Sequence, residues 1–287
     1  MTIVGFRKIS YTFSGVLVAA SFLALGVWGL RLGIDFTGGS LMEIEYKNVR
    51  PLVNLPDVSA QPVGESGLIL RLPAIDEIRH QAILAELRKG GEFEEKQFTS
   101  VGPTIGQELK KNSFYAIILV MVMIALYIAW TFREVSRPVS SWKYGVAALV
   151  ALVHDVSIPA GFFAFLGHFY GVTVDTLFVT ALLTILGFSV HDTIVVFDRI
   201  RENLKKFGGR EQFENVVETS LRQTIGRSIN TSLTVMLVML ALYFFGGAST
   251  QMFSLAILIG VFFGTYSSIF IASFLLVSWN KWSLKRA

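Results

Sequence analysis

The chain of 287 residues contains no cysteine and little charge. Without cysteine it has no disulfide framework, no thiolate chemistry and no cysteine-containing metal site. Only 16% of its residues are charged, whereas a soluble domain typically carries about 25%. Hydrophobic residues make up 53%, and 24 residues are Phe. The net charge of +4 does not by itself indicate a nucleic-acid partner, because that requires a clustered basic face. The composition indicates a membrane protein.

Long apolar runs are the strongest feature that is present. A run of about 20 apolar residues is long enough to cross a bilayer as a helix. We identify six such runs, at residues 11–30, 113–132, 143–166, 174–197, 224–245 and 253–279. The sequence therefore predicts a polytopic α-helical membrane protein with six transmembrane helices. A polar stretch, 31–112, separates the first helix from a bundle of five at 113–279.

The basic residues predict the orientation of these helices. Cytoplasmic loops are enriched in Lys and Arg, whereas long loops translocate largely regardless of charge. The links 167–171 ("GHFYG") and 246–251 ("GGASTQ") contain neither residue. The basic clusters lie before the first span, between the second and third, between the fourth and fifth, and at the end of the chain: Arg7, Lys8; Arg133, Arg137, Lys143; Arg199, Arg201, Lys205, Lys206, Arg210, Arg222, Arg227; Lys281, Lys285, Arg286. Both the N-terminal tail 1–10 and the basic tail 280–287 are therefore expected in the cytoplasm, and 31–112 outside it.

A cleavable signal peptide is the alternative for the first apolar run. Arg7 and Lys8 precede that run, as basic residues precede the apolar region of a signal peptide. The run is longer than the usual apolar region of about 7–15 residues, and "ALG" at 24–26 is a poor cleavage site. We therefore interpret 11–30 as the first transmembrane helix.

The stretch 31–112 predicts a small α+β domain of the order β-β-α-β. From 40 to 46 the residues alternate, with Met42, Ile44 and Tyr46 on one side, which is strand periodicity. Residues 67–73 and 92–101 are the other expected strands. The helix expected at 74–90 has an apolar stripe of Ile75, Ile78, Ala82, Leu84 and Leu87. Gly38-Gly39 and Gly102-Pro103, at the edges of the domain, fit turn chemistry.

Ionisable residues inside the spans are the candidate functional residues. His154 and Asp155 lie about halfway along the third span. His191 and Asp192 lie about six residues before Asp198, or about 9 Å inside the cytoplasmic end of the fourth span. Arg227 lies at a similar depth in the fifth. We expect Asp192 and Arg227 to approach each other as an ion pair.

Two interpretations of this pair are open: a static ion pair that fixes helix packing, or a proton relay. A charge near the centre of a membrane helix costs roughly 2.5–3.5 kcal/mol on insertion scales, whereas Gly and Ser allow close packing without that cost. An apolar site favours a protonated aspartate, and a nearby arginine favours the ionised form. The group can then alternate between the two forms as helices move, so the relay is the favoured reading.

The remaining polar features of the bundle have simpler interpretations. The two His-Asp pairs fit interhelical hydrogen bonding, and with no third ligand they are a weak metal signal. Arg227, Thr231 and Thr234, flanked by Ser228 and Ser232, predict a polar seam facing the bundle interior. Gly187, Gly260 and Gly264 fit close helix packing. The amphipathic connector 198–223 is expected on the cytoplasmic membrane surface, as one or two short helices broken at Gly208-Gly209.

Four motifs, in order along the chain, resemble the SecD/SecF family of the resistance–nodulation–division superfamily, in the form of its SecF branch. They are "IDFTGGS" (34–40), "VGPTIGQEL" (101–109), "SVHDTIVVFDRIREN" (189–203) and "QTIGRSINTS" (223–232). The resemblance covers essentially the whole chain. The residues that carry the family signature are Asp35, Phe36, Gly38, Gly39, Gly102, Pro103, Gly106, Asp198 and Arg199.

The resemblance implies a bacterial inner-membrane subunit that works with a separate SecD and the SecYEG channel. It implies use of the proton-motive force to promote late-stage translocation and release of preproteins on the outer side. The partners are then SecD, SecYEG, preprotein, membrane lipid and protons, with no nucleic acid. Asp192 and Arg227 match the family's functional charges. Asp155, His154 and His191 are secondary relay candidates, since many relatives have Asn where this chain has His191.

Three other functions compete with this one. An intramembrane enzyme would use the His-Asp pairs, but the chain has neither an HExxH zinc motif nor a GxSxG nucleophile elbow, and we expect no enzymatic activity, cofactor or metal. A passive scaffold would only stabilise SecD and SecYEG. A proton-driven exporter of the same superfamily would usually have twelve spans and two large outer domains.

Overall fold

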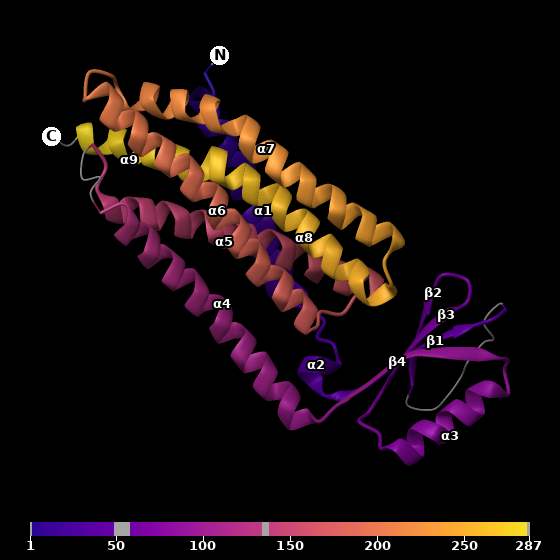
Figure 1. Ribbon diagram of the computed structural model, residues 1–287. Helices are drawn as coiled ribbons and strands as arrows, with labels where there is room; N and C mark the ends of the chain where they lie inside the picture. The colour runs from indigo at the N-terminus through magenta and orange to yellow at the C-terminus, as the bar shows by residue number, and fades with distance from the viewer. Residues whose placement is uncertain (1, 49–57, 134–137, 286–287) are drawn as a thin grey trace. The chain divides into compact units, whose positions relative to one another are not determined.

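The computed structural model describes residues 2–48, 58–133 and 138–285. The chain divides into two compact units (Figure 1). The helical unit contains Met1–Leu30, Ala116–Val172 and Leu177–Ala287. The sheet unit contains Arg31–Tyr115 together with Thr173–Thr176.

Six helices are long and apolar enough to cross a membrane, as the sequence predicts. They are α1 (Arg7–Val27), preceded by the 3-10 turn Val4–Phe6; α4 (Pro103–Thr131); α5 (Ser141–Tyr170); α6 (Thr176–Phe207); α7 (Phe213–Phe245); and a last span built from α8 (Ala248–Ser267), the π-helix η2 (Ser268–Ala272) and α9 (Ser273–Leu284). Among the described residues, these spans depart from α-helical geometry at the 3-10 turn that starts the first span and at the π-helix of the last.

The connector 198–223 is not a pair of separate surface helices, and that prediction is wrong. α6 continues to Phe207 and α7 already begins at Phe213, so only a short turn remains between them. Gly208 and Gly209 make that turn with positive φ angles of 57° and 78°. The apolar residues expected on the membrane surface instead enter the main core of the helical unit: Ile200, Phe213, Val217 and Leu221. Because these residues continue the helical periodicity of α6 and α7, they are buried against other helices rather than against the membrane surface.

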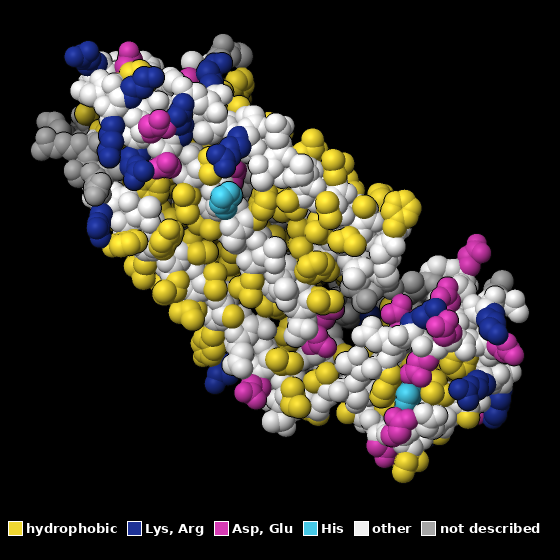
Figure 2. All heavy atoms as spheres, in the orientation of Figure 1, with side chains coloured by type: hydrophobic (Ala, Val, Ile, Leu, Met, Phe, Trp, Pro, Cys, Tyr) yellow, Lys and Arg dark blue, Asp and Glu magenta, His cyan; other side chains and the backbone are white. Residues whose placement is uncertain are grey.

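The first turns of the chain pack against the start of α7 and the end of α9. Arg7 Nη1 pairs with Glu214 at 2.7 Å, Lys281 pairs with the same carboxylate, and the Val4 N–H donates to Glu218 at 3.0 Å. Both ends of the described chain therefore meet at one end of the helical unit. Figure 2 shows Lys and Arg gathered at this end, beside a broad band of exposed hydrophobic side chains. Arg137 and Arg286 lie outside the described residues.

The sheet unit contains four antiparallel strands in the order β2-β3-β1-β4. They are β1 (Gly39–Tyr46), β2 (Ser59–Val63), β3 (Gly67–Leu72) and β4 (Phe93–Val101). Met42, Ile44 and Tyr46 are buried, which confirms the predicted alternation of β1. The predicted β-β-α-β order is incomplete, because it misses β2. Pro62 lies within β2, and a proline is tolerated there because β2 is an edge strand.

The helix of this unit, α3 (Glu77–Arg88), buries a different stripe from the predicted one. His80, Ile83, Leu84 and Leu87 are buried, at spacings of three and four residues, whereas Ile78 is 81% exposed and Ala82 is exposed. Leu84 and Leu87 confirm part of the prediction. A stripe drawn from apolar residues alone does not include His80. Its ring stacks on Phe98 of β4 with 3.8 Å between the ring centroids, and its Nε2 bonds Glu95 at 2.8 Å.

Glycine allows close contact between helices at several places. A Cβ on Gly260 would lie 2.1 Å from Ile185, and one on Gly264 would lie 3.2 Å from Ser189. A Cβ on Gly161 of α5 would lie 2.4 Å from the Cα of Ser21 of α1. Gly187 has nothing within 4 Å of the corresponding position, so the prediction holds for Gly260 and Gly264 and is wrong for Gly187.

This contrast gives a stability test. We expect Gly161→Ala to destabilise the helical unit by about 1–3 kcal/mol, because the methyl group meets backbone of α1 that cannot move independently. Gly187→Ala, also within a helix, is the matched control and should not destabilise. The measurement is the thermal unfolding midpoint of each variant in detergent. Equal midpoints for Gly161→Ala and the wild type would contradict the contact.

Candidate functional site

Asp155 is the most buried ionisable residue of the helical unit among those the structure describes. It lies in α5 with no exposed surface. Its Oδ1 bonds Nδ1 of His154 at 2.9 Å, and its Oδ2 accepts from Ser267 Oγ of α8 at 2.8 Å and from Ser189 Oγ of α6. Three helices therefore supply polar groups to one carboxyl.

Asp192 lies in α6 and is 7% exposed. Its Oδ1 accepts a hydrogen bond from Ser228 Oγ of α7. Its Oδ2 is buried and, within the described part of the chain, has no hydrogen-bond partner. A buried carboxylate oxygen without a partner is costly, and protonation removes the charge that makes it so. Asp192 is therefore held by one neighbouring helix while half of its carboxyl stays open.

Arg227 does not pair with Asp192 in this structure. The two residues lie at the same level, since Asp192 precedes the end of α6 by 15 residues and Arg227 follows the start of α7 by 14. Arg227 is nevertheless exposed, and no ion pair among the described residues joins the two. The expected ion pair is wrong for this conformation.

The polar seam of α7 is rotated relative to the predicted one. The buried hydroxyl residues are spaced by four: Ser220, Thr224, Ser228 and Ser232. Arg227, Thr231 and Thr234 are exposed on another face. The prediction took the charged residue as the centre of the seam, whereas packing turns the small hydroxyl residues toward α6 and α8. Ser232 bonds Thr265 of α8 directly.

The π-helix η2 lies at the junction of these hydroxyl groups. Ser268 Oγ bonds Thr193 Oγ of α6 at 2.8 Å and lies 3.2 Å from the carbonyl oxygen of Ser189. Single-turn π-helices inside α-helices occur often at functional sites. Here the wider turn follows Ser267, whose hydroxyl bonds Asp155.

His154 and His191, the histidines that precede the two buried aspartates, differ in their surroundings. His154 is 3% exposed, lies against Tyr266 and Phe263, and has its Nε2 buried without a partner among the described residues. His191 is exposed and lies next to Asp192 in sequence. The structure thus brings His154 and Asp155 into one buried cluster and leaves His191 at its edge.

The signature residues near the first span meet within the sheet unit. The N–H and hydroxyl of Thr176, the first residue of α6, donate to Asp35 Oδ2 at 2.9 and 2.6 Å. Asp35 and Phe36 belong to the short helix α2 (Ile34–Thr37), and Phe36 is buried. The Gly33 N–H donates to the Val174 carbonyl at 2.8 Å. Asp35 therefore satisfies donors that the start of α6 would otherwise leave open.

The signature glycines allow this junction to close. Gly38, with φ of 76°, leaves no room for a Cβ, which would lie 2.7 Å from the Cα of Pro103. A Cβ on Gly106 would lie 2.9 Å from the Gly38 nitrogen. Gly39 has φ of 129° and faces the Leu72 carbonyl. Gly102 has open space around it. The turn interpretation therefore explains Gly38 and Gly39, and close backbone contact explains Gly106.

Asp198 and Arg199 form local contacts near the end of α6. Asp198 Oδ1 pairs with Arg201, and Arg199 pairs with Glu202 and donates to Gln223 of α7 at 2.6 Å. Asn203 donates to Ser220 and Gln223 at 2.9 Å. Arg199 and its neighbour Asn203 therefore join α6 to α7, whereas Asp198 pairs within α6.

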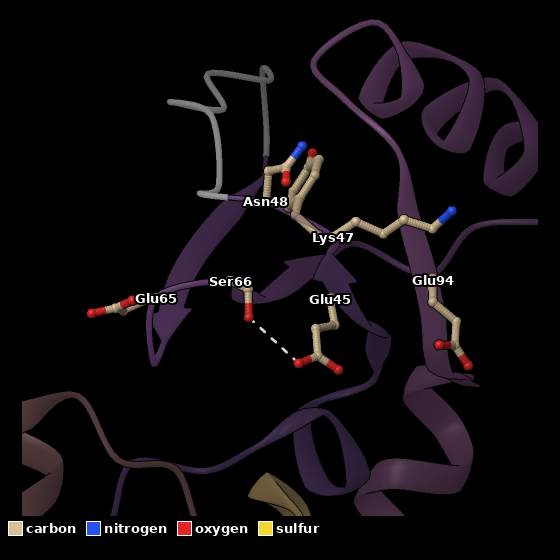
Figure 3. A pocket seen from close by; sticks show the side chains of 7 residues that line it. Glu45, Lys47, Asn48, Glu65, Ser66 and Glu94 are labelled. Atoms are coloured by element: carbon tan, nitrogen blue, oxygen red, sulfur yellow. Dashed lines mark hydrogen bonds between the residues drawn. The ribbon is translucent and has the colours of Figure 1, made fainter.

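A shallow cavity on the sheet unit is lined by Glu45, Tyr46, Lys47, Asn48, Glu65, Ser66 and Glu94. Figure 3 shows Glu65 and Lys47 pointing in opposite directions, while Ser66 bonds Glu45. Lys96 pairs with both Glu45 and Glu94, and its hydrogen bond lowers the pKa of Glu94. Glu45 and Glu94 therefore share one lysine, and Figure 3 shows Glu65 pointing away from both. Among the described residues no group of three or more His, Asp and Glu is placed to hold a metal.

The sequence does not identify the serines that contact the buried aspartates and the π-helix as site residues. They are Ser189, Ser228, Ser267 and Ser268. A hydroxyl within an apolar span is a signal, because Ser and Thr hydrogen-bond across membrane helices. The signal is unspecific, since these spans contain many such residues and only the helix rotation selects among them.

Fold and site define a multi-pass helical membrane protein whose buried carboxyl groups are held by hydroxyls of neighbouring helices. The family model for the protein export membrane protein SecD/SecF, C-terminal, matches residues 80–282, and the model for the SecD/SecF GG motif matches residues 24–48. The chain belongs to the SecD/SecF family.

Its relatives include SecF subunits from two bacteria. The protein translocase subunit SecF of Thermobaculum terrenum is 46% identical, over 97% of this chain and 94% of the relative. That of Anaerolinea thermophila is 37% identical, over 98% and 94%. The crystal structure of SecDF from Thermus thermophilus, a translocon-associated membrane protein, has a TM-score of 0.84 and 31% identity. The match covers 98% of this chain and 39% of SecDF, so the chain corresponds to well under half of that protein.

The capping contact of Asp35 gives a prediction. We expect Asp35→Ala to lower stability by about 0.5–2 kcal/mol, because two donors of Thr176 lose their acceptor. Asp35→Asn keeps a side-chain oxygen and should lose less. Thermal unfolding in detergent measures both. A wild-type midpoint for Asp35→Ala would show that the cap contributes nothing.

Proposed function

We propose that this chain, together with a separate SecD, uses the proton-motive force to promote late-stage translocation and release of preproteins through SecYEG. The observation that carries the proposal is Asp192, a carboxyl buried in a membrane helix with one oxygen lacking a partner. Intramembrane ionisable residues that face a bundle interior commonly mark ion or proton paths. The names of the relatives supply the Sec context.

The proposed cycle alternates Asp192 between two forms. In the proposed cycle Asp192 carries its proton in the conformation described here, where Arg227 is exposed and no described Lys or Arg pairs with Asp192. A rotation of α7 that brings Arg227 against Asp192 favours the ionised carboxylate and releases the proton. Because Ser228 already bonds Asp192 and Arg227 is the preceding residue, about 100° away around the helix, a rotation of α7 changes which side chain meets Asp192. Proton uptake and release are thereby tied to helix movement.

A partner in the membrane is supported by the exposed faces of α4 and α7. Few side chains of either helix are buried within the chain. Leu119, Val122 and Leu126 of α4, and Leu233 and Leu237 of α7, are exposed apolar residues. Lipid or another helical subunit must cover them, and SecD fits because the matching structure is a longer SecDF chain. The basic end of the helical unit supports a cytoplasmic location of both termini in the inner membrane (Figure 2).

The first test removes the proton-carrying group. Inner-membrane vesicles containing SecD, SecYEG and matched amounts of this chain are assayed for preprotein release with and without a proton gradient. We expect Asp192→Asn to abolish the acceleration caused by the gradient while ATP-driven translocation continues, because Asn cannot exchange a proton. Arg227→Gln should also uncouple release from the gradient.

The matched control is Glu202→Gln, which removes an exposed carboxylate from the same helix. It should respond to the gradient like the wild type. A full response from Asp192→Asn, with normal assembly, sinks the relay proposal and leaves the passive scaffold as the better account. Gradient dependence for a different substrate, with none for preproteins, would instead support an exporter.

A further inference from the structure

Asp155 is a fully buried carboxyl group that has no part in the proposed cycle. It has no exposed surface, and an isolated ionised carboxylate in such a place is very costly. Close packing of α5 does not require it, since Gly145 and Gly161 already bring that helix against α4 and α1. The carboxyl therefore invites a role beyond packing.

The groups that face Asp155 from each packed helix are few. From α5 comes His154, from α6 Ser189, and from α8 Ser267. Tyr266 of α8 packs against His154 rather than Asp155, and its hydroxyl donates to the Ser10 carbonyl of α1 and accepts from Ser14. Within the described ranges no Lys or Arg contacts Asp155, so no permanent cation balances its charge. Only a proton, on Asp155 or on His154, can do so.

Asp155 is coupled to Asp192 through α6. Ser189, which donates to Asp155, precedes Asp192 by three residues, or about 4.5 Å along the helix axis. Residues three apart lie on the same helical face. Two carboxyls coupled in this way do not both ionise readily, and their protons come off in steps that belong to the pair.

Two buried atoms without partners lie at this pair. They are Asp192 Oδ2 and His154 Nε2, each in a residue more than nine-tenths buried. When the neutral His154 ring donates a hydrogen bond from Nδ1–H to Asp155, its Nε2 carries a free lone pair. Asp192 Oδ2 can thus give up or take a proton, and His154 Nε2, on the other side of Asp155, can accept one.

We infer that Asp155, supported by His154, is a second proton-binding site that exchanges a proton with Asp192. The inference rests on the proposed function. No hydrogen bond joins Asp192 to Ser189 among the described residues, so the transfer begins when the open Oδ2 of Asp192 turns toward the Ser189 hydroxyl on the same helical face. The O–H bond of the Asp192 carboxyl then breaks, Ser189 Oγ takes that proton, and the proton that Ser189 held moves to a carboxylate oxygen of Asp155. One proton and one negative charge change places, and the total charge of the pair is unchanged. The site extends the relay from α6 to α5.

The test is infrared difference spectroscopy of the full chain, assembled with SecD in liposomes, across a pH step. We expect wild type to show two carboxyl C=O signals. Asp155→Asn should lose one, Asp192→Asn the other, and Asp155→Asn should also lose gradient-driven release. Ser157→Ala is the control, because Ser157 is buried in α5 but donates only to the His154 carbonyl. It should keep both signals and the gradient response.

The outcomes separate the two proposals. If Asp192→Asn keeps its gradient response, the proposed function fails. If Asp192→Asn loses the response but Asp155→Asn matches wild type in both assays, only the second site is overturned. Should Asp155→Asn fail to assemble, Ser189→Ala decides, because it removes the hydroxyl that carries the proton and keeps both carboxyls. Gradient-driven release should be lost and the Asp155 signal should shift. Wild-type release from Ser189→Ala overturns the inference.

Discussion

A polar group inside a membrane protein has to find its partner within the protein, because hydrocarbon supplies none. This constraint organises the helical unit. Asp155 of α5 takes hydroxyls from α6 and α8, Asp192 of α6 takes one from α7, and Thr193 meets Ser268 of the π-helix. These contacts fix the rotation of four helices at once. The same contacts leave Asp192 Oδ2 without a hydrogen-bond partner among the described residues, so the seam that orders the bundle also contains a buried, unpaired carboxyl oxygen.

The sheet unit obeys a different constraint, which is backbone contact. Gly38, Pro103 and Gly106 approach so closely that a single added Cβ would clash. Asp35 closes the junction by accepting both donors of Thr176. Since Thr176 is the first residue of α6, and Pro103 the first of α4, this junction defines where two membrane helices begin. The motifs around Gly38 and Gly106 therefore have a structural role at the start of α4 and α6. The motif at 189–203 contains the buried Asp192.

Local sequence patterns predict those features that depend on local chemistry. The six spans follow from apolar length, and the strands β1, β3 and β4 follow from alternation and turn residues. Edge strand β2 contains a proline and has no clear alternation, so it was missed. The stripe of α3 was displaced because His80 is polar by type yet buried by its two glutamates and Phe98. The connector was misplaced because an amphipathic pattern does not say whether lipid or another helix covers its apolar face.

The sequence by itself determined which residues carry charge into the membrane, namely Asp155, Asp192 and Arg227, because charge in an apolar run is visible without any coordinates. It also determined the family, since four motifs in order are specific. Only the tertiary structure decided which of these residues meet. Helix rotation turned Arg227 outward and Ser228 inward, and packing of α5, α6 and α8 surrounded Asp155 with hydroxyls. Rotation is set by contacts between distant segments, and no local pattern records them.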